Sequence, residues 1–305
     1  MRHAAELLEK WLVIKKEKVK ETTWYSYRNN VSRWLHTRIA KVPIQKLKAM
    51  EIEQALSSIK GKPHAKKDSY MTLLTALNKA VKWKLISENP MNAVEPVKVE
   101  MQELLVWTEK ETLRFLETAK KSVYYVMFVV ALKTGTRISE LLGLQWRNVD
   151  LEAREIRIVQ GMVELPGGRK KVQSPKTKRS VRKIPIDSKT VQMLQEYKAK
   201  REEVALKKGY KDVPWVFWSD RTGQPPARNK PWRALRIYAE KAGLGKSNLH
   251  RLRHSHATFL LRKGVHPKIV AERLGHSMLS MTERYSHVFP DSQQEAVKAM
   301  EKMEF

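Results

Sequence analysis

The chain has no cysteine among its 305 residues. Disulfide bonds and thiolate metal sites are therefore excluded, and the composition fits a reducing, cytoplasmic setting. The first residues lack the apolar core of a signal peptide, and no uncharged apolar run approaches the roughly twenty residues that span a bilayer. Internal repeats and low-complexity segments are also absent. We expect a soluble intracellular protein that does not bind a membrane.

Acidic side chains are scarce. The 32 Asp and Glu residues stand against 60 Lys and Arg, so the formal net charge is +28. A charge of this size concerns the binding partner and the association rate rather than the fold. Nucleic acid is the favoured partner, because each phosphate that is neutralised releases counterions. A protein that is merely basic, or one that binds a membrane surface, is the alternative at this point.

The length predicts about two domains. Apolar residues recur at helical spacing from residue 4 to residue 89. The pattern breaks down around Pro96, and Thr108 with Glu111 then forms a possible capping box for a new helix. We therefore predict a helical first domain over 1–94, a linker over 95–106 and a second domain over 107–305.

The second domain mixes helices with a few short strands. An apolar run over 124–132 stops at Gly135 and predicts a buried helix. Further helices are expected over 138–146, after Asp187 and in a C-terminal tail over 292–303. Strands are expected over 155–163, 169–174 and 180–186. The predicted fold class is mainly α with a small antiparallel β-sheet.

Two groups of basic residues are candidates for DNA contact. In the first domain they alternate with aromatics, although any solvated helical face also carries charge: Lys16, Lys18, Lys20, Arg28 and Arg33. The segment 165–186 holds eight basic residues and no acidic one, whereas folded surfaces usually intersperse their charges. The DNA-contact candidates in this segment are Arg169, Lys170, Lys171, Lys178, Arg179 and Arg182.

A further set of residues suits phosphodiester cleavage without a metal. Arg137 and Arg253 can clamp a phosphate, because the guanidinium binds it in a bidentate way and stays protonated. Lys176 can protonate a leaving oxygen, and His276 can bind the phosphate or move a proton. Tyr285 is the candidate nucleophile, and it needs nearby cations and a proton acceptor because its ordinary pKa is near 10.

His250 and His254 lie four residues apart, a spacing that also occurs in metal sites. The paired-histidine metal motif needs a glutamate base and a third ligand. Here Arg251 and Arg253 surround the pair with positive charge, which would repel a cation. We expect an anion site and neither a metal nor another cofactor.

Taken together, these residues resemble the tyrosine recombinase family, the phage-integrase type of site-specific recombinase. The resemblance runs in order through the second domain and lies in Thr134–Leu142 (TGTRISELL), Pro175–Thr177 (PKT), His250–Thr258 (HRLRHSHAT), Leu274–His276 (LGH) and Thr282–His287 (TERYSH). The helical first domain resembles the family's core-binding domain.

The resemblance implies a role for each matching residue. Arg137, His250, Arg253 and His276 would surround the scissile phosphate, and Lys176 would be the general acid. Tyr285 would form a 3′-phosphotyrosyl link that needs neither ATP nor metal. Glu140 would orient Arg137, and His254 would support the site.

The family also implies partners. Its members act on double-stranded DNA at specific recombination sites, as tetramers on two duplexes, and the tail helix over 292–303 would dock in trans on a neighbouring subunit. The setting would be a bacterial cytoplasm or a phage-infected host. Many integrases carry a further N-terminal domain that binds arm sites, and this chain starts almost at the core-binding domain. It is either a simpler recombinase or a chain that lacks that domain.

Three alternatives stay open on the sequence. A type IB topoisomerase shares the phosphotyrosine chemistry, a non-catalytic basic protein explains the charge, and a metal-dependent nuclease would cut by another route. The DNA target, the direction of the reaction, the biological role and the delivery of Tyr285 in cis or in trans are not readable from the sequence.

Overall fold

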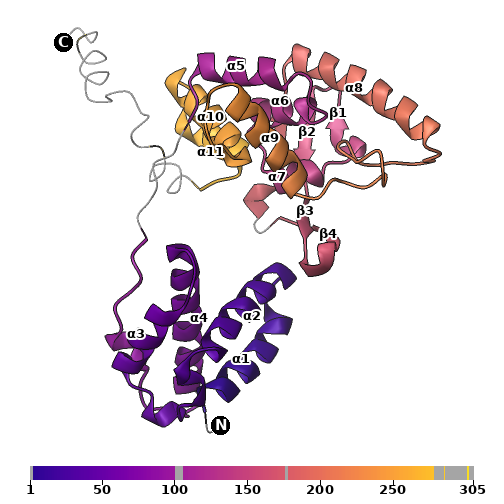
Figure 1. Ribbon diagram of the computed structural model, residues 1–305. Coiled ribbons are helices and arrows are strands. Elements are labelled where there is room, and N and C mark those ends of the chain that lie inside the picture. Colours follow the sequence, from indigo (N-terminus) through magenta and orange to yellow (C-terminus); the bar gives the residue numbers. More distant parts are fainter. Residues whose placement is uncertain (1–2, 100–105, 176–177, 278–284, 286–300, 302–305) are drawn as a thin grey trace. The chain divides into compact units, whose positions relative to one another are not determined.

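The computed structural model describes residues 3–99, 106–175, 178–277, 285 and 301. The chain divides into two compact units, Met1–Gln102 and Glu103–Phe305 (Figure 1). The boundary falls inside the linker predicted over 95–106. Among the described residues, every helix is too short or too polar to span a lipid bilayer.

The first unit is helical and has its own core. Its α-helices are α1 (Ala4–Lys18), α2 (Glu21–Leu35), α3 (Ala49–Ser58) and α4 (Pro63–Lys82), and its 3-10 turns are η1 (Arg38–Lys41), η2 (Ile44–Lys46) and η3 (Pro90–Ala93). Trp34 of α2 is fully buried and donates its indole N–H to the Ser69 carbonyl of α4 at 2.8 Å. The neighbouring Asn30 donates to Thr72 Oγ1 at 3.0 Å, so polar groups also fix the register of α2 on α4.

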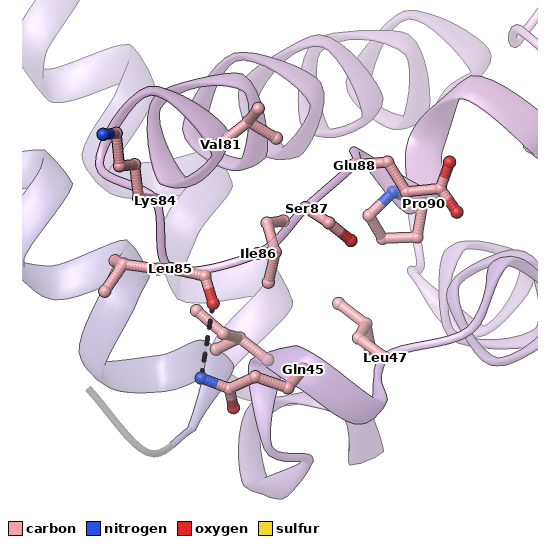
Figure 2. Close-up of a pocket in the computed structure, with 10 residues that line it drawn as sticks. Gln45, Leu47, Val81, Lys84, Leu85, Ile86, Ser87, Glu88 and Pro90 are labelled. Atoms are coloured by element: carbon pink, nitrogen blue, oxygen red, sulfur yellow. Dashed lines mark hydrogen bonds between the residues drawn. The ribbon is translucent and has the colours of Figure 1, made fainter.

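The first unit contains a cavity of about 600 Å³ beside the C-terminal end of α4. Figure 2 shows its lining, where Gln45 donates to the Leu85 carbonyl at 3.4 Å and Lys84 and Glu88 supply the charged groups. The rest of the lining is largely apolar, with Ile44, Leu47, Val81 and Ile86. This cavity contains neither histidine nor arginine, so it is not the predicted phosphate site.

The described part of the second unit contains seven α-helices: α5 (Glu109–Ala119), α6 (Tyr125–Thr134), α7 (Ile138–Leu142), α8 (Ser188–Lys207), α9 (Asn229–Lys241), α10 (Leu249–Arg262) and α11 (Pro267–Leu274). It also has the 3-10 turns η4 (Trp146–Asn148), η5 (Pro166–Gly168) and η6 (Lys178–Ser180). The predicted capping box is present, since Glu111 N donates to Thr108 Oγ1 and Thr108 N donates to Glu111 Oε2. The predicted apolar helix is α6, which ends at Gly135 in the left-handed conformation. Helix α6 packs against α10 and α8 in the core.

The strands form two small antiparallel sheets. One has the order β1 (Val149–Asp150), β2 (Glu155–Ile158), β5 (Arg182–Pro185), and the other pairs β3 (Gly161–Glu164) with β4 (Lys170–Gln173). Ile156 lies opposite Ile184 in the first sheet, and both are buried. The predicted class, mainly α with a small antiparallel sheet, is confirmed.

Two predicted elements differ from the structure. The strand expected over 155–163 is split into β2 and β3, which belong to different sheets. Strand β3 begins at Gly161, which lies close to α7, since a Cβ there would lie 3.3 Å from the Ser139 carbonyl oxygen. The helix expected over 138–146 ends at Leu142. Its last part is extended instead, with Val216 N donating to the Leu144 carbonyl at 3.0 Å.

Candidate active site

Helix α10 carries three of the predicted site residues on successive positions of one face. Its N-terminus is fixed by Asn248, whose side-chain oxygen accepts from Arg251 N at 3.1 Å. Leu252 is buried in the main core of the unit. The predicted site residues His250, Arg253 and His254 share another face of the helix, which Ala257 and Leu261 continue toward Tyr285.

Arg253 is the most deeply buried cation of the site and is only 3% exposed. Its guanidinium donates to the Gly135 carbonyl at 2.5 Å, to the Leu274 carbonyl at 2.8 Å and to His276 Nε2 at 2.7 Å. Burial, followed by the charge of Arg137, lowers the pKa of Arg253 to about 9. The group therefore stays cationic at neutral pH, held by neutral acceptors.

Gly135 and Gly275 are needed at the turns that present these carbonyls. Both have positive φ, +65° and +68°. A Cβ on Gly135 would lie 2.5 Å from Leu274 Cδ2 and 2.6 Å from His256 Cδ2, so no side chain fits there. The absence of a side chain lets α6, α10 and α11 meet around Arg253.

Arg137 lies directly before α7 and is held by Glu140. Its Nη1 donates to Glu140 Oε1 at 2.9 Å, and its Nη2 lies 3.5 Å from the Gly275 carbonyl oxygen. The side chain remains 31% exposed, so part of the guanidinium is open to a ligand. Arg137, from the N-cap of α7, and Arg253, from α10, therefore reach adjacent carbonyls of one turn, Leu274–His276.

Glu140 has a second partner, Arg182 of β5. The Arg182 Nη2 donates to Glu140 Oε2 at 2.9 Å, and both side chains are under one tenth exposed. Burial by itself raises the pKa of Glu140, but the hydrogen bond and charge of Arg182, and then Arg137, outweigh it and lower the pKa overall. Glu140 is therefore an anion that links two arginines.

The hydroxyl of Tyr285 lies 2.6 Å from His254 Nδ1. The tyrosine side chain is fully buried, at 0% exposure, and packs with Ala257, Leu261, Val270 and Leu274 of α10 and α11. The structure thus brings the predicted nucleophile to the cationic cluster within one chain.

His250 lies at the start of α10 and is exposed. It lines a cavity of about 520 Å³ together with Ile138, Asn248 and Trp232. Lys176 lies outside the described residues, and so does the tail helix predicted over 292–303 except for residue 301. Within the described ranges, no three histidine, cysteine or acidic side chains gather in a way that could hold a metal ion.

The basic residues predicted to contact DNA in the first unit lie on α1 and α2 and next to them. The exposed ones are Lys16, Lys18, Lys20 and Arg28. Lys16 Nζ lies 5.6 Å and Arg28 Cζ 5.8 Å from the centre of the Trp24 ring. Arg33 is half-buried and donates to Asn30 Oδ1 at 2.5 Å.

The predicted DNA contacts of the second unit fall into two groups. Arg169, Lys171 and Arg179 are exposed, and Lys170 and the backbone of Lys178 lie in β4 and η6 (Lys178–Ser180). Figure 1 shows that β3 and β4 project from the helices of this unit. Arg182 differs, because its side chain is only 6% exposed and paired with Glu140, whereas a DNA contact requires an accessible guanidinium.

Two side chains of the site were missed from the sequence, Arg273 and His256. Arg273 Nε donates to His256 Nε2 at 3.2 Å behind Arg253. His256 lies three residues after Arg253 and shares its helical face, which is the one signal that the sequence carries for it.

Family models match segments of both units of the chain. The family model described as phage integrase family matches residues 106–291, and the model described as phage integrase, N-terminal SAM-like domain, matches residues 5–59. A tyrosine recombinase XerC-like protein of Caldanaerobacter subterraneus subsp. tengcongensis is 29% identical, over 97% of this chain and 82% of that protein. The ICEBs1 integrase of Bacillus subtilis is 26% identical, over 77% of this chain and 66% of that protein.

Solved structures show the same fold. The Tn1549 transposon integrase in complex with a circular intermediate DNA aligns with a TM-score of 0.83 at 21% identity, covering 98% of this chain and 100% of that one. A lambda integrase dimer bound to a core site aligns with a TM-score of 0.68 at 18% identity, covering 95% of this chain and 77% of that one. The chain therefore belongs to the phage integrase family of tyrosine recombinases, which are DNA breaking and rejoining enzymes.

Proposed function

We propose that this chain is a site-specific recombinase that cuts and rejoins double-stranded DNA through a 3′-phosphotyrosyl intermediate on Tyr285. The observation that carries the proposal is the contact of the Tyr285 hydroxyl with His254, next to the buried cation Arg253. A phenol becomes a nucleophile when a neighbouring base takes its proton and cations lower the cost of its ionisation.

The scissile phosphate would bind where Arg137, Arg253 and His276 converge. Arg253 and His276 are already joined by a hydrogen bond of 2.7 Å, and Arg137 has an exposed edge. Two guanidinium groups that are fixed before the reaction stabilise the charge that builds on the non-bridging oxygens. His250, at the exposed end of α10, would complete the ring around the phosphate.

The proposed cleavage step balances without a cofactor. The Tyr285 oxygen bonds to phosphorus, its proton passes to His254, and the bond from phosphorus to the 5′ oxygen breaks. Lys176, a residue outside the described part, would give that oxygen its proton. The reverse attack by a 5′ hydroxyl of another strand restores a phosphodiester, so the bond energy is kept in the covalent link.

The partner would be double-stranded DNA carrying specific recombination sites. The net charge of +28 and the exposed basic side chains on α1 and α2 favour phosphate contacts. Two related folds were solved with DNA, and a lambda integrase of similar fold was solved as a tetramer on a Holliday junction. We expect a tetramer on two duplexes, with the tail over 292–303 docked in trans. Deletion after Pro290 should then weaken synapsis more than binding to a single site.

A suicide substrate tests the proposal. A duplex selected by the chain from a randomised library receives a nick near the cleavage position, so that the released strand diffuses away and the covalent product accumulates. Denaturing gels should show an adduct that maps to Tyr285 and forms in EDTA. Tyr285→Phe should lose the adduct and keep DNA affinity, whereas the control Tyr238→Phe should keep both.

The same experiment separates the alternatives. An adduct together with relaxation of supercoils but no joining of two duplexes would favour a type IB topoisomerase. Binding without any adduct would leave a non-catalytic DNA-binding protein, and cleavage that stops in EDTA would point to a metal-dependent nuclease.

A further inference from the structure

Arg273 occupies the last turn of α11, directly before the turn Leu274–His276, and its side chain joins three other elements. The Nη2 donates to the Lys133 carbonyl at the end of α6 and to the Pro185 carbonyl at the end of β5, both at 3.0 Å. The Nε donates to His256 Nε2 of α10 at 3.2 Å. One guanidinium therefore fixes the end of α11 against α6, α10 and β5.

His256 can accept the hydrogen bond from Arg273 at neutral pH. It is buried, and this burial, followed by the charge of Arg273, lowers its pKa to about 3. Its neutral ring keeps a lone pair on Nε2 for the guanidinium. The same ring packs on Gly135, whose carbonyl holds Arg253.

The backbone around Arg273 holds the arginines of the site. The Leu274 carbonyl accepts from Arg253 at 2.8 Å, and the Gly275 carbonyl lies 3.5 Å from Arg137 Nη2. The carbonyl of Arg273 itself accepts from Arg182 Nε at 2.7 Å. A shift of this turn would therefore move both phosphate-binding arginines and His276 together.

We propose that Arg273 and His256 are positioning residues of the cleavage reaction, which keep the turn Leu274–His276 in register with Arg137 and Arg253. This inference rests on the proposed function, because it assigns the pair a role in phosphotyrosyl formation. Neither side chain needs to touch DNA. A misplacement of about 1 Å in such a site can cost roughly 100-fold in rate.

The test uses variants of matched shape in the full chain. His256→Phe keeps a ring and removes the acceptor, and His256→Gln restores an acceptor near the Nε2 position. Arg273→Lys keeps the charge and removes the planar fork. Arg114→Lys, at an exposed position of α5, is the control for the same chemical change.

Single-turnover adduct formation on the selected nicked duplex is measured beside DNA affinity and thermal unfolding. We expect His256→Phe and Arg273→Lys to slow adduct formation by about 10- to 100-fold, with DNA affinity within about twofold. His256→Gln should recover most of the rate, and Arg114→Lys should match the unaltered chain. Rates are taken well below the unfolding temperature of each variant, so a loss of folded protein does not count as slow chemistry.

A second substrate separates positioning from a general loss of structure. A methylphosphonate at the scissile position removes one charged oxygen, so the reaction depends less on the placement of the arginines. The penalty of His256→Phe should shrink on this substrate. An equal penalty on both substrates, or full activity of His256→Phe on the phosphate, would overturn the inference. Failure of the unaltered chain to form any adduct would instead overturn the proposed function.

Discussion

His254 Nδ1 lies 2.6 Å from the hydroxyl oxygen of Tyr285, and His254 directly follows Arg253 in α10. One helical turn therefore supplies both the buried cation of the proposed phosphate site and a proton acceptor for the proposed nucleophile. This contact suggests a more direct role for His254 than the supporting role that the sequence suggested. It makes His254 the first histidine to test as the general base.

Replacement of His254 should slow adduct formation. A positioned general base typically contributes 100- to 10,000-fold, so we expect His254→Phe to lose about 100-fold or more while DNA affinity is kept. His266→Asn, at the exposed N-cap of α11, is the control. Full activity of His254→Phe would move the role to His250.

Replacement of Glu140 should destabilise the second unit. Glu140→Gln removes the charge between Arg137 and Arg182, and breaking a buried ion pair costs roughly 3–5 kcal/mol. Because the pKa of Glu140 is lowered in the folded state, its contribution is present above its unfolded pKa and is lost as the pH falls through the folded value. Urea unfolding checks this, with Glu203→Gln on α8, whose exposed side chain pairs with Lys207, as a control that should change far less.

Two glycine substitutions separate steric conflict from backbone strain. Gly135→Ala places a Cβ 2.5 Å from Leu274 Cδ2 at a φ of +65°, whereas Gly167→Ala has a φ of +78° and no atom within 4 Å. We expect roughly 1–2 kcal/mol of destabilisation at Gly167 from backbone strain alone and clearly more at Gly135. Gly135→Ala should also impair adduct formation. Equal unfolding temperatures for the two variants would contradict the packing of Gly135.

The stability of the protein should depend on pH through His256. Its pKa is about 3 in the folded state against an ordinary value of 6.5, so its contribution is complete above pH 6.5 and is lost as the pH falls toward 3. The neighbouring Arg273, Arg253 and Lys133 stay cationic over this range. The unaltered chain should therefore lose up to about 1.4 kcal/mol more per pH unit than His256→Gln. Parallel curves for the two proteins would show that the ring is not held neutral.

Arg179 should contribute to DNA affinity through charge. It is exposed and lies near the turn at Gly275, whereas Lys207 on α8 is exposed and pairs with Glu203. Arg179→Gln should weaken binding and reduce the salt slope of the association constant by about one. Lys207→Gln removes the same charge and should leave the slope unchanged. The measurement is a titration of a labelled duplex at several salt concentrations.

Local signals in the sequence predicted much of the fold. The Thr108 capping box and the apolar helix that stops at Gly135 depend on neighbouring residues alone, and both are present. The separation of 155–163 into two strands comes with the packing of β3 against α7, a tertiary contact that no local sequence pattern indicates. Likewise, Arg182 was predicted to contact DNA because it is basic. Its burial is explained by its ion pair with Glu140, which lies far away in the sequence.

The residues of the site could be named from spaced motifs, but their contacts could not. The sequence places His254 and Tyr285 thirty-one positions apart, and Arg273 and His256 seventeen apart. Arg273 and His256 meet because α10 and α11 pack side by side, and Tyr285 packs on residues of the same two helices. Which groups form a hydrogen bond across such a separation in the sequence depends on how whole helices pack.

The turn Leu274–His276 has a practical consequence for protein engineering. Three arginines, Arg137, Arg253 and Arg182, donate to carbonyls at or next to this turn. A single substitution in the turn would therefore displace several of them at once and abolish activity, so that no variant with partial activity would remain for selection. Graded changes in activity are better sought at exposed basic residues outside this turn, such as Arg169 and Lys171, which can be altered one at a time.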